Sequence, residues 1–547
     1  MLRVANDSFA GVTPGLLQPA LVAEFQAQTS ARSDEEFVSE LASLARIPSP
    51  VTRDFLVDML VDLASSGRTA RARVALPVVA EALTDEESYK RGCLRLLVNL
   101  QFALAVLLMK EVQRTQPPAP AIGQWLSVAM RYHYRYRCES RALAPEQALE
   151  AVRDATAAIN DRPEGLSLAT IVEPRLLADC KATECSFQSE AIKVTPPLVA
   201  DQDGVPRVAE HLTVAQQTLG FARVANATVI GCRSTIFFGA DLVADDPLSN
   251  MAVGEFSPFG MEDAYAGVVF HLSGDNGRKV VVVRRPQPGE RIERGVFLNG
   301  HYQYNYFHWL AEYLTQLPYI LDQSAYADWP LLIGEEALAH ANHVRLLQRL
   351  AGAVQRQVIA LRKNVAYSVG ELLLPPKLAR VTLCHTRIDS RPEDYAFAPG
   401  AIRRLHDGLA APGGTPRRRI FLARKRDDRL LNQPAIRAEF EQAGFESVHP
   451  EDLDFERARL LFAETAYLAG PTGAAFTNLL LCPPGATAII FTTDLGRRAG
   501  FFSGLAGPLG QTVIYVDGPG QTAGLTLSPF EIDPRRVRRL LQLLLPQ

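Results

Sequence analysis

The stretch YLAGPTGAAFTNLLLCPPGATAIIF, residues 467–491, contains a strand, a tight loop, a helix and a second strand. The first apolar run ends at Ala469, residues 470–473 form a Gly-Pro-Thr-Gly loop, and helical spacing begins near Ala474. Glycines let a ligand approach backbone N–H groups, and a helix N-terminus carries partial positive charge that suits a phosphate. Any strand–helix turn needs glycine, however, so the loop alone is equally compatible with a purely structural role.

The same alternation of strand and helix continues on both sides of this stretch. Strands that alternate with helices of this length predict a doubly wound parallel sheet, and so an α/β fold. The predicted strands are RRRIFLAR (417–424), FESVHP (445–450), TAYLAG (465–470), ATAIIF (486–491) and TVIYV (512–516), and the predicted helices are 433–444, 454–464 and 473–481. The last stretch, DPRRVRRLLQLLLPQ (533–547), predicts a basic amphipathic helix that packs back on the fold rather than on a membrane.

Basic side chains follow the first of these strands. Arg424, Lys425, Arg426 and Arg429 stand in the predicted loop after residues 417–424. Doubly wound sheets bind ligands at the carboxyl ends of their strands, and arginines there can hold a diphosphate through forked hydrogen bonds. A solvated basic loop explains this run alone, but two phosphate-compatible loops in one sheet favour a nucleotide site.

A second chemical pattern lies upstream, in NYFHWLAEYLTQLPYIL (305–321). Asn305 stands where a helix N-cap should, and Pro318 permits at most a kinked continuation. Histidine His308 and glutamate Glu312 are four residues apart and therefore one helical turn apart, on a face beside the apolar stripe. The stripe consists of Phe307, Leu310, Leu314, Leu317 and Leu321.

Composition limits the classes of protein that remain. With 547 residues, we expect two to four domains, and 47% hydrophobic with 21% charged residues is an ordinary globular balance. A net charge of −3 argues against a nucleic-acid partner. Seven scattered cysteines without a C-x-x-C pair predict reduced thiols and a cytoplasmic protein. No stretch is apolar for long enough to predict a membrane span, which leaves at most peripheral membrane contact.

The rest of the chain divides into regions that differ in predicted secondary structure. Residues from about Ser33 to Ile159 predict helices, including one buried helix in CLRLLVNLQFALAVLLMKEV (93–112). From about Ile192 to Asn299 short β-rich runs follow, with a hairpin tip at Asn276-Gly277. GLAAPGGTP (408–416) has the composition of a flexible connection.

The metal signals are weak. Asp201 to Asp203 match a D-x-D pattern but sit in a turn-like segment, and His340 with His343 predicts a solvated pair. We therefore expect neither a metal nor another cofactor. Walker, G-x-S-x-G and strand-linked G-x-G-x-x-G motifs are absent from the sequence.

Four segments together resemble glycosyltransferase family 61, in the family's order and within about Ile192 to Val516. NYFHWLAEYLTQLP resembles its N-Y-x-H-W-L-x-E-x-L-P stretch, and RRIFLARKRDDRLLNQ resembles its strand, arginine loop and R-x-L-N-E. GFESVHPEDLDF resembles G-F-x-x-V-x-P-E-x-L, and AGPTGAAFTNLLLCPPGATAIIF resembles G-x-H-G-A-x-x-T-N-x-x-F-x-P-P-G-A. The departures are Thr472 for the histidine, Arg457 and Ala458 for an E-Q pair, and Ile490 for a glutamate.

The resemblance implies a GT-B-like pair of Rossmann-type domains and inverting, metal-independent transfer from a nucleotide-sugar donor, as in bacterial polysaccharide biosynthesis. It implies a glycan or protein acceptor. The expected domains are a helical docking domain (1–180), a β-rich segment with an acceptor-side domain (181–407) and a nucleotide-sugar-binding domain (408–547). Catalysis is expected at His308 and Glu312, and donor binding at Arg424, Arg429, Asn432, Thr472, Gly473 and Asn478.

Two other functions remain open at this stage. The departures are compatible with an inactive, transferase-like binding or assembly subunit, and the fold is compatible with a sugar-nucleotide epimerase. The N-terminal helices contain no phosphate-binding loop or acid–base pair. We expect them to recruit an acceptor, a partner subunit or a second copy of the chain.

Overall fold

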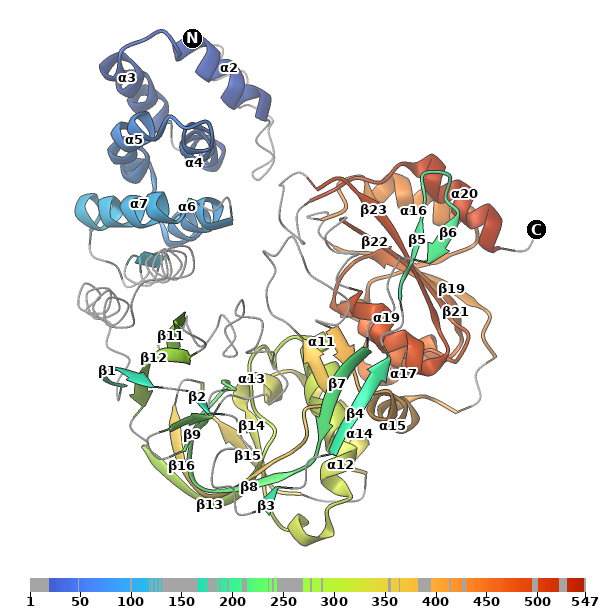
Figure 1. Ribbon diagram of the computed structural model, residues 1–547. Coiled ribbons are helices and arrows are strands. Elements are labelled where there is room, and N and C mark those ends of the chain that lie inside the picture. Colours follow the sequence, from blue (N-terminus) through green and yellow to red (C-terminus); the bar gives the residue numbers. More distant parts are fainter. Residues whose placement is uncertain are drawn as a thin grey trace. The chain divides into compact units, whose positions relative to one another are not determined.

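The protein is described by a computed structural model in which the chain forms two compact units. Unit 1 comprises Met1–Glu173 and Ala264–Pro286, and unit 2 comprises Pro174–Asp263 and Gln287–Gln547. Figure 1 labels the elements of each unit. The structure describes residues 19–545, apart from short breaks of one to three residues and the stretches 130–165, 176–183, 209–213, 244–268, 382–394, 426–428, 494–499 and 521–528.

Unit 1 begins with helices that bury one apolar stripe each, as the N-terminal sequence predicts. At Ser33 the hydroxyl accepts from the Glu36 N–H while the Glu36 carboxylate accepts from the Ser33 N–H, so both groups cap the helix start. Phe37 and Leu41 of that helix are fully buried in a core shared by all its neighbours. The helices are α2 (Pro19–Thr29), α3 (Asp34–Ala45), α4 (Pro50–Ser65), α5 (Thr69–Ala82), α6 (Glu86–Val98) and α7 (Phe102–Thr115).

Two predictions for this unit need correction. The expected single helix over 93–112 is two helices, α6 and α7, which pack against each other. Within the described residues, no helix is both long and apolar enough to cross a bilayer. The unit is also not purely helical, because it includes the antiparallel sheet β1-β12-β11, made of β1 (Leu166–Val172), β11 (Val269–Asp275) and β12 (Arg278–Pro286). The Asn276-Gly277 hairpin tip and the helices expected from residue 130 to Ile159 fall outside the described residues.

Unit 2 contains two mixed sheets. The first has a parallel part, β15-β14-β13-β16, onto which β8, β9 and β10 add antiparallel, while β2 pairs in parallel with β10. A cluster that includes Val224, Val229 and Leu332 is buried on it. The strands of this sheet, in spatial order, are β15 (Val358–Leu361), β14 (Leu331–Gly334), β13 (Glu290–Phe297), β16 (Ala366–Leu374), β8 (Ala222–Ile230), β9 (Ile236–Phe238), β10 (Asp241–Val243) and β2 (Pro174–Arg175), with β3 (Glu184–Cys185) on β8.

The second sheet confirms the predicted strand and helix alternation. Five strands of the C-terminal region pair in parallel in the order β20-β19-β21-β22-β23, between helices on both faces. Gly470, with a φ of 154°, lies so close to the Leu422 carbonyl oxygen of β19 that a Cβ there would approach within 2.6 Å. The elements are β19 (Arg418–Leu422), α16 (Gln433–Gln442), β20 (Glu446–Val448), α17 (Phe455–Ala463), β21 (Thr465–Pro471), β22 (Thr487–Thr493) and β23 (Thr512–Gly518).

This sheet also receives a hairpin from far earlier in the chain, which the sequence did not predict. Strand β5 (Leu198–Ala200) pairs in parallel with β23, and β6 (Pro206–Val208) returns beside it (Figure 1). The hairpin turn meets α20 (Pro534–Leu544), since a Cβ on Gly204 would lie 2.7 Å from the Arg536 carbonyl oxygen. The buried Arg536 guanidinium donates to the carbonyls of Ala200, Asp201 and Asp517. The terminal helix therefore packs back on the fold, as predicted.

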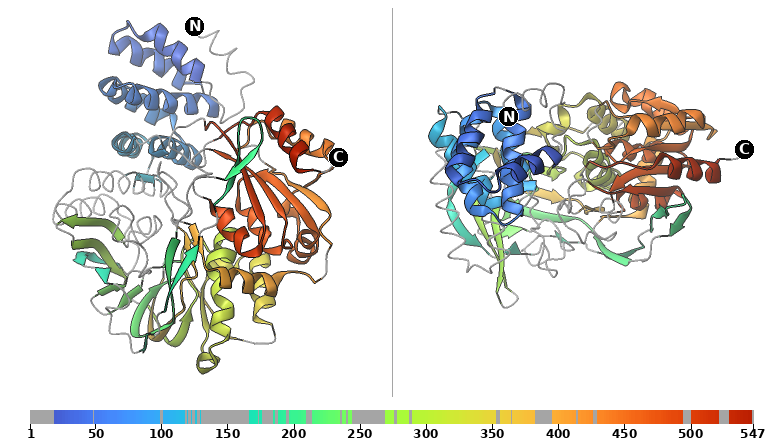
Figure 2. Two further views of the ribbon diagram at one scale, coloured as in Figure 1. Left: turned by 45° about the vertical axis from the view of Figure 1, so that its right-hand side comes forward. Right: turned by 90° about the horizontal axis from the view of Figure 1, so that it is seen from above.

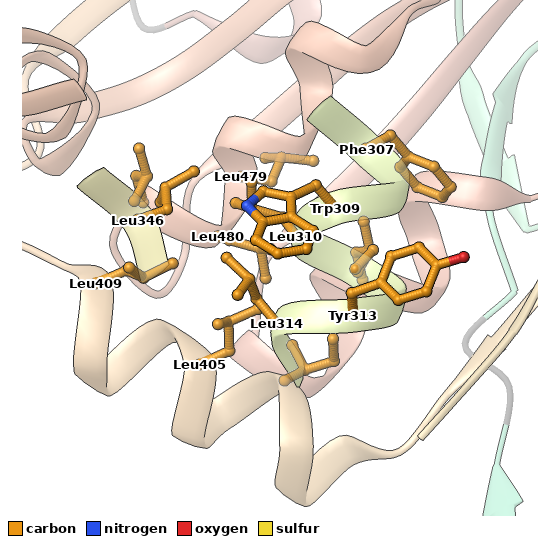
Figure 3. Packing of buried hydrophobic residues seen from close by; sticks show 14 of the residues in the cluster. Phe307, Trp309, Leu310, Tyr313, Leu314, Leu346, Leu405, Leu409, Leu479 and Leu480 are labelled. Atoms are coloured by element: carbon orange, nitrogen blue, oxygen red, sulfur yellow. The ribbon is translucent and has the colours of Figure 1, made fainter. Parts of the chain in front are cut away.

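One apolar core joins the two sheets of unit 2. Figure 3 shows Trp309, Leu310 and Leu314 from the 305–321 segment among Leu479 and Leu480 of the second sheet's region. Burial of a Leu-sized side chain is worth about 1.5–3 kcal/mol, so this shared cluster holds the two parts firmly together. Figure 2 shows unit 2 from two further sides.

The helices around this core complete the unit. Helix α15 (Pro399–Leu409) extends into the expected connection 408–416, of which residues 413–414 are outside the described part. Leu405 and Leu409 of α15 enter the shared core. The other elements are β4 (Gln188–Lys193) paired with β7 (Val214–Leu219), η5 (Ser324–Tyr326), α13 (Glu335–Leu338), α14 (Ala341–Ala351), β17 (Ala379–Val381) paired with β18 (Tyr395–Phe397), η7 (Pro450–Asp452), α19 (Phe501–Ala506) and η9 (Gly507–Leu509).

Candidate functional site

The segment 305–321 is an irregular helix rather than the regular one that its apolar spacing predicts. Asn305 caps it, since its side-chain oxygen accepts a hydrogen bond from the Phe307 N–H at 2.9 Å. After one α-helical turn, α11 (Tyr306–His308), the chain widens into the π-helical turn η3 (Trp309–Tyr313). It then narrows into the 3-10 turn η4 (Leu314–Gln316) before α12 (Leu317–Leu321). Wide turns of this kind recur at functional sites.

Two buried polar side chains explain how an apolar segment tolerates the wide turn. A π turn leaves carbonyls without their usual partner, and a buried unpaired carbonyl is costly. The Thr315 hydroxyl lies 3.2 Å from the Ala311 carbonyl oxygen and 3.1 Å from that of Glu312. The Gln316 amide also donates to the Glu312 carbonyl, at 2.8 Å. These two residues therefore stabilise the turn that carries Glu312.

His308 and Glu312 are in direct contact, as their spacing predicts. Nδ1 of the imidazole and Oε1 of the carboxylate form a hydrogen bond, and both side chains are largely buried. The Tyr302 ring stacks on the imidazole with centroids 5.1 Å apart, and the Phe307 ring meets it edge-on at 5.3 Å. A carboxylate on Nδ1 fixes that nitrogen as the proton-bearing one and leaves the Nε2 lone pair to accept a proton.

The helical turn that carries the imidazole follows the carboxyl end of a parallel strand, β13. Residues 298–304 connect β13 to α11, and buried amides fix this connection. Asn299 accepts from the Cys232 N–H and donates to the carbonyls of Ile230 and Arg233. Gln303 donates to the Leu298 carbonyl and accepts from the Gly334 N–H at the end of β14. Sequence reasoning missed these residues, although a polar and aromatic run directly after a predicted strand is a usable signal.

His343 was wrongly expected to be solvated. Its side chain is buried, stacked on Trp309 with centroids 5.8 Å apart, and the Trp309 indole N–H donates to its carbonyl. Burial, reinforced by His340, lowers the pKa of His343 from 6.5 to about 4. The ring is therefore neutral at neutral pH and belongs to the packing behind the π turn.

The second sheet brings Arg424, Arg429, Thr472 and Gly473 together at the carboxyl ends of β19 and β21. Arg429 donates to the Thr472 carbonyl at 3.0 Å. The Arg424 guanidinium reaches the same loop, since a Cβ on Gly473 would lie 3.2 Å from its Nη1. The Thr472 N–H donates to the Phe491 carbonyl at 2.8 Å. It is thus engaged within the sheet, contrary to the expectation that it faces a phosphate.

The two asparagines expected at the donor site, Asn432 and Asn478, form hydrogen bonds to the backbone and to the start of the 305–321 segment. Asn432 braces its loop, because its amide donates to the Ile532 carbonyl and accepts from the Ile532 N–H. Asn478 is buried and accepts from the Tyr306 hydroxyl at 2.9 Å. It lies in η8 (Ala474–Leu481), an eight-residue 3-10 helix where an α-helix was predicted. Asn478 therefore ties the helix after the Gly473 loop to the turn that carries His308.

The positions that depart from the expected motifs differ in setting. Ile490 is fully buried in β22, within the shared apolar core. A charged side chain at this position would therefore have no contact with solvent. Arg457 is an exposed residue in the first turn of α17, close to its N-cap Asp454. Ala458, beside it, is buried. Of these departures, Thr472 contacts the arginine loop, because its carbonyl accepts a hydrogen bond from Arg429.

The Asp201–Asp203 segment, which matches the D-x-D pattern, stabilises a turn. The Asp201 carboxylate accepts from the backbone N–H groups of Asp203 and Val205 and pairs with Arg207 at 2.7 Å, which closes the β5–β6 turn. Across the described parts of the chain, no group of three or more His, Cys, Asp or Glu side chains has the arrangement of a metal site.

Comparison with known proteins finds a match to one protein family. A family model described as Glycosyltransferase 61 matches residues 306–490. The match begins at the turn that carries His308 and ends in β22, so it includes both the imidazole–carboxylate pair and the arginine loop. It confirms the resemblance and leaves the N-terminal helices outside. No curated protein matches the chain.

Proposed function

We propose that the chain, whose residues 306–490 match the Glycosyltransferase 61 family model, transfers a sugar from a nucleotide-sugar donor to a glycan or protein hydroxyl. We further propose a GT-B-like arrangement, single-displacement chemistry with inversion, and no metal on the diphosphate. The observation that carries the proposal is the His308–Glu312 contact, in a turn tied through Asn478 to the helix that follows the Gly473 loop.

His308 is the base in this scheme. The acceptor oxygen attacks the anomeric carbon of the donor while its proton passes to Nε2 of His308. Glu312 holds Nδ1 and stabilises the imidazolium that results.

Arg424 and Arg429 receive the leaving group. The bond between the anomeric carbon and the phosphate oxygen breaks, and its electron pair departs with the nucleoside diphosphate. Both guanidiniums lie against the Gly473 loop. Forked, charge-assisted hydrogen bonds from arginine suit a diphosphate, and no metal is then needed for charge balance.

Nucleotide binding tests this assignment. Thermal-shift measurements with UDP, GDP, CDP, ADP and TDP identify the nucleotide, and calorimetry then measures its Kd. Arg424→Ala and Arg429→Ala should each weaken binding by about 10–100-fold, because a hydrogen bond to a charged group is worth about 1.5–3 kcal/mol. Lys425→Ala is the matched control, since Lys425 lies in the same loop as the arginines but pairs with Asp452 of η7. Wild-type affinity in both arginine variants would refute the donor site.

A second candidate function, an inactive binding or assembly subunit, has one specific support. The family position that commonly carries a glutamate is the buried Ile490. Such a subunit would bind the nucleotide sugar without turnover, whereas an epimerase would return a rearranged sugar nucleotide. Chromatography of the sugar nucleotide after incubation separates the three outcomes, because a transferase in the absence of acceptor hydrolyses it slowly to free sugar and nucleotide.

We propose that the N-terminal region, expected to end near residue 180 and lying mostly in unit 1, recruits an acceptor, a partner subunit or a second copy of the chain. Cys93, Cys232 and Cys482 are buried free thiols, which suits the reducing cytoplasm. The His308–Glu312 pair and the arginine loop are both formed by residues of unit 2, and this supports a role for unit 1 outside the chemistry.

A further inference from the structure

The connection between β13 and α11 alternates between side chains fixed in the protein and side chains at its surface. His301 and Gln303 are buried, whereas Tyr302 is half-buried and Tyr304 is 43% exposed. Gln303 is held by two backbone hydrogen bonds, and the His301 carbonyl accepts from the Tyr313 hydroxyl at 2.7 Å. The connection is therefore a fixed support that holds Tyr302 against His308 and Tyr304 against Tyr302.

Tyr302 adopts an unfavourable backbone conformation to reach its place. Its φ is 54°, in the left-handed region, which costs a residue with a Cβ about 1–2 kcal/mol. The fixed residues on either side impose this conformation. The result is a continuous aromatic surface: the Tyr302 ring stacks on the imidazole, and the Tyr304 ring meets Tyr302 at 6.1 Å and 62°.

An aromatic surface beside a base selects a particular ligand. One face of a pyranose ring is lined by C–H groups that pack on the electron-rich face of a tyrosine, while its hydroxyls stay available for reaction. Tyr304 is the one aromatic residue among the well-exposed large apolar side chains of the described chain. Burial of the apolar parts of a ligand is what such a residue offers at a binding site.

We propose that Tyr302 and Tyr304 form an acceptor subsite for a sugar ring, so that the acceptor is a glycan rather than a protein hydroxyl. This rests on the proposed function, because the group next to the base must carry the attacking hydroxyl. The nucleoside diphosphate belongs at the arginine loop of the other sheet. A sugar packed on Tyr304 presents its hydroxyl towards the imidazole that Tyr302 holds.

The test uses the full-length protein and saturation-transfer NMR with methyl glycosides of glucose, galactose, mannose, N-acetylglucosamine, rhamnose and xylose. At least one should bind, and Tyr304→Ala should weaken it about fivefold or more, as expected for loss of one aromatic contact. Tyr304→Phe should retain binding, because the ring rather than the hydroxyl makes the contact. Leu460→Ala, an exposed apolar residue on α17, is the matched surface control and should change nothing.

Three results would overturn the subsite: no glycoside of the panel binds, Tyr304→Ala binds as well as wild type, or only Tyr304→Phe loses binding. Calorimetry with the nucleoside diphosphate separates this proposal from the proposed function. Its Kd should change less than twofold in Tyr304→Ala, and a large loss would mean that the tyrosines stack on the nucleobase instead. If wild type binds a glycoside through Tyr304 but no nucleotide, the transferase function fails while the sugar subsite stands.

Discussion

The two loops that make up the candidate site are held in opposite ways. The connection after β13 is fixed from inside, by the buried amides of Asn299 and Gln303. The arginine loop after β19 is held from outside, by partly exposed guanidiniums that reach the Thr472 carbonyl and the Gly473 position. A base has to be fixed before substrate arrives. Arginines that bind a charged leaving group can exchange a hydrogen bond to a backbone carbonyl for one to a phosphate.

The contrast teaches where flexibility is tolerated in this molecule. An amide with all its partners buried cannot rearrange without leaving polar groups unpaired, whereas an arginine at the surface loses little when it changes acceptor. The acceptor side should therefore be the same with and without ligand, and the donor side should change.

Loss of a buried amide should cost far more than loss of a similar amide on the donor side. Asn299→Ala removes three buried hydrogen bonds, to the Cys232 N–H and to the carbonyls of Ile230 and Arg233, and we expect it to lower the free energy of unfolding by about 3–5 kcal/mol. Asn432→Ala loses two partly buried hydrogen bonds to the Ile532 backbone and should lower the free energy of unfolding by about 1–2 kcal/mol. Urea unfolding followed by tryptophan fluorescence measures both. Equal losses would abolish the contrast between the loops.

Acid should weaken unit 2 through His343. The folded state holds this pKa at about 4 and the unfolded chain near 6.5, so stability is complete above pH 6.5 and falls as the pH drops towards 4. The full loss is about 3 kcal/mol, since each unit of pKa difference is worth 1.36 kcal/mol. His343→Phe keeps a ring on Trp309 and should remove this part of the pH dependence. Unfolding curves at pH 7 and pH 5 that differ equally in both proteins would rule out His343 as the cause.

The π turn should loosen when its side-chain donors are removed. Thr315→Val is nearly isosteric and removes one donor, for an expected cost of about 1 kcal/mol, while Thr315→Ser keeps the hydroxyl and should cost less. Gln316→Leu should behave like Thr315→Val, because it removes the donor to the Glu312 carbonyl. Hydrogen exchange measured by mass spectrometry should accelerate across residues 306–321. Unchanged exchange would mean that packing alone maintains the turn.

The second sheet was predictable almost strand by strand, and the reason is physical. Each of its parallel strands is followed within a short distance by the helix that covers it, so local apolar patterns and glycine turns define the order. The His308–Glu312 contact was predictable for the same reason, since a spacing of four residues is a property of one helical turn.

Long-range pairing was not predictable. The β5–β6 hairpin joins β23 across more than three hundred residues, and β8 joins β16 antiparallel, which no local pattern encodes. The π turn was missed because Thr315 and Gln316 look like surface residues in an apolar helix until the carbonyls that they satisfy are known. His343 was misjudged because its solvation depends on Trp309, which lies 34 positions earlier.

The smallest expected effect concerns unit 1 and the nucleotide. A chain that begins at Ala182 lacks the helices and also β1, so β11 and β12 stay behind as a two-stranded insertion that has lost its third strand. A second version, which also replaces residues 264–286 by a short glycine–serine linker, removes unit 1 completely. Both versions should stay folded by circular dichroism and bind the nucleoside diphosphate with a Kd within about twofold of wild type, since the arginine loop is built from unit 2 alone.

Glycosylation of the natural acceptor should fall in both truncated versions, because recruitment is then lost. If either version loses nucleotide binding although circular dichroism shows it folded, unit 1 helps to build the donor site and its docking role has to be abandoned. If only the version that retains residues 264–286 loses binding, the exposed two-stranded remnant β11–β12 is the cause, and the docking role stands.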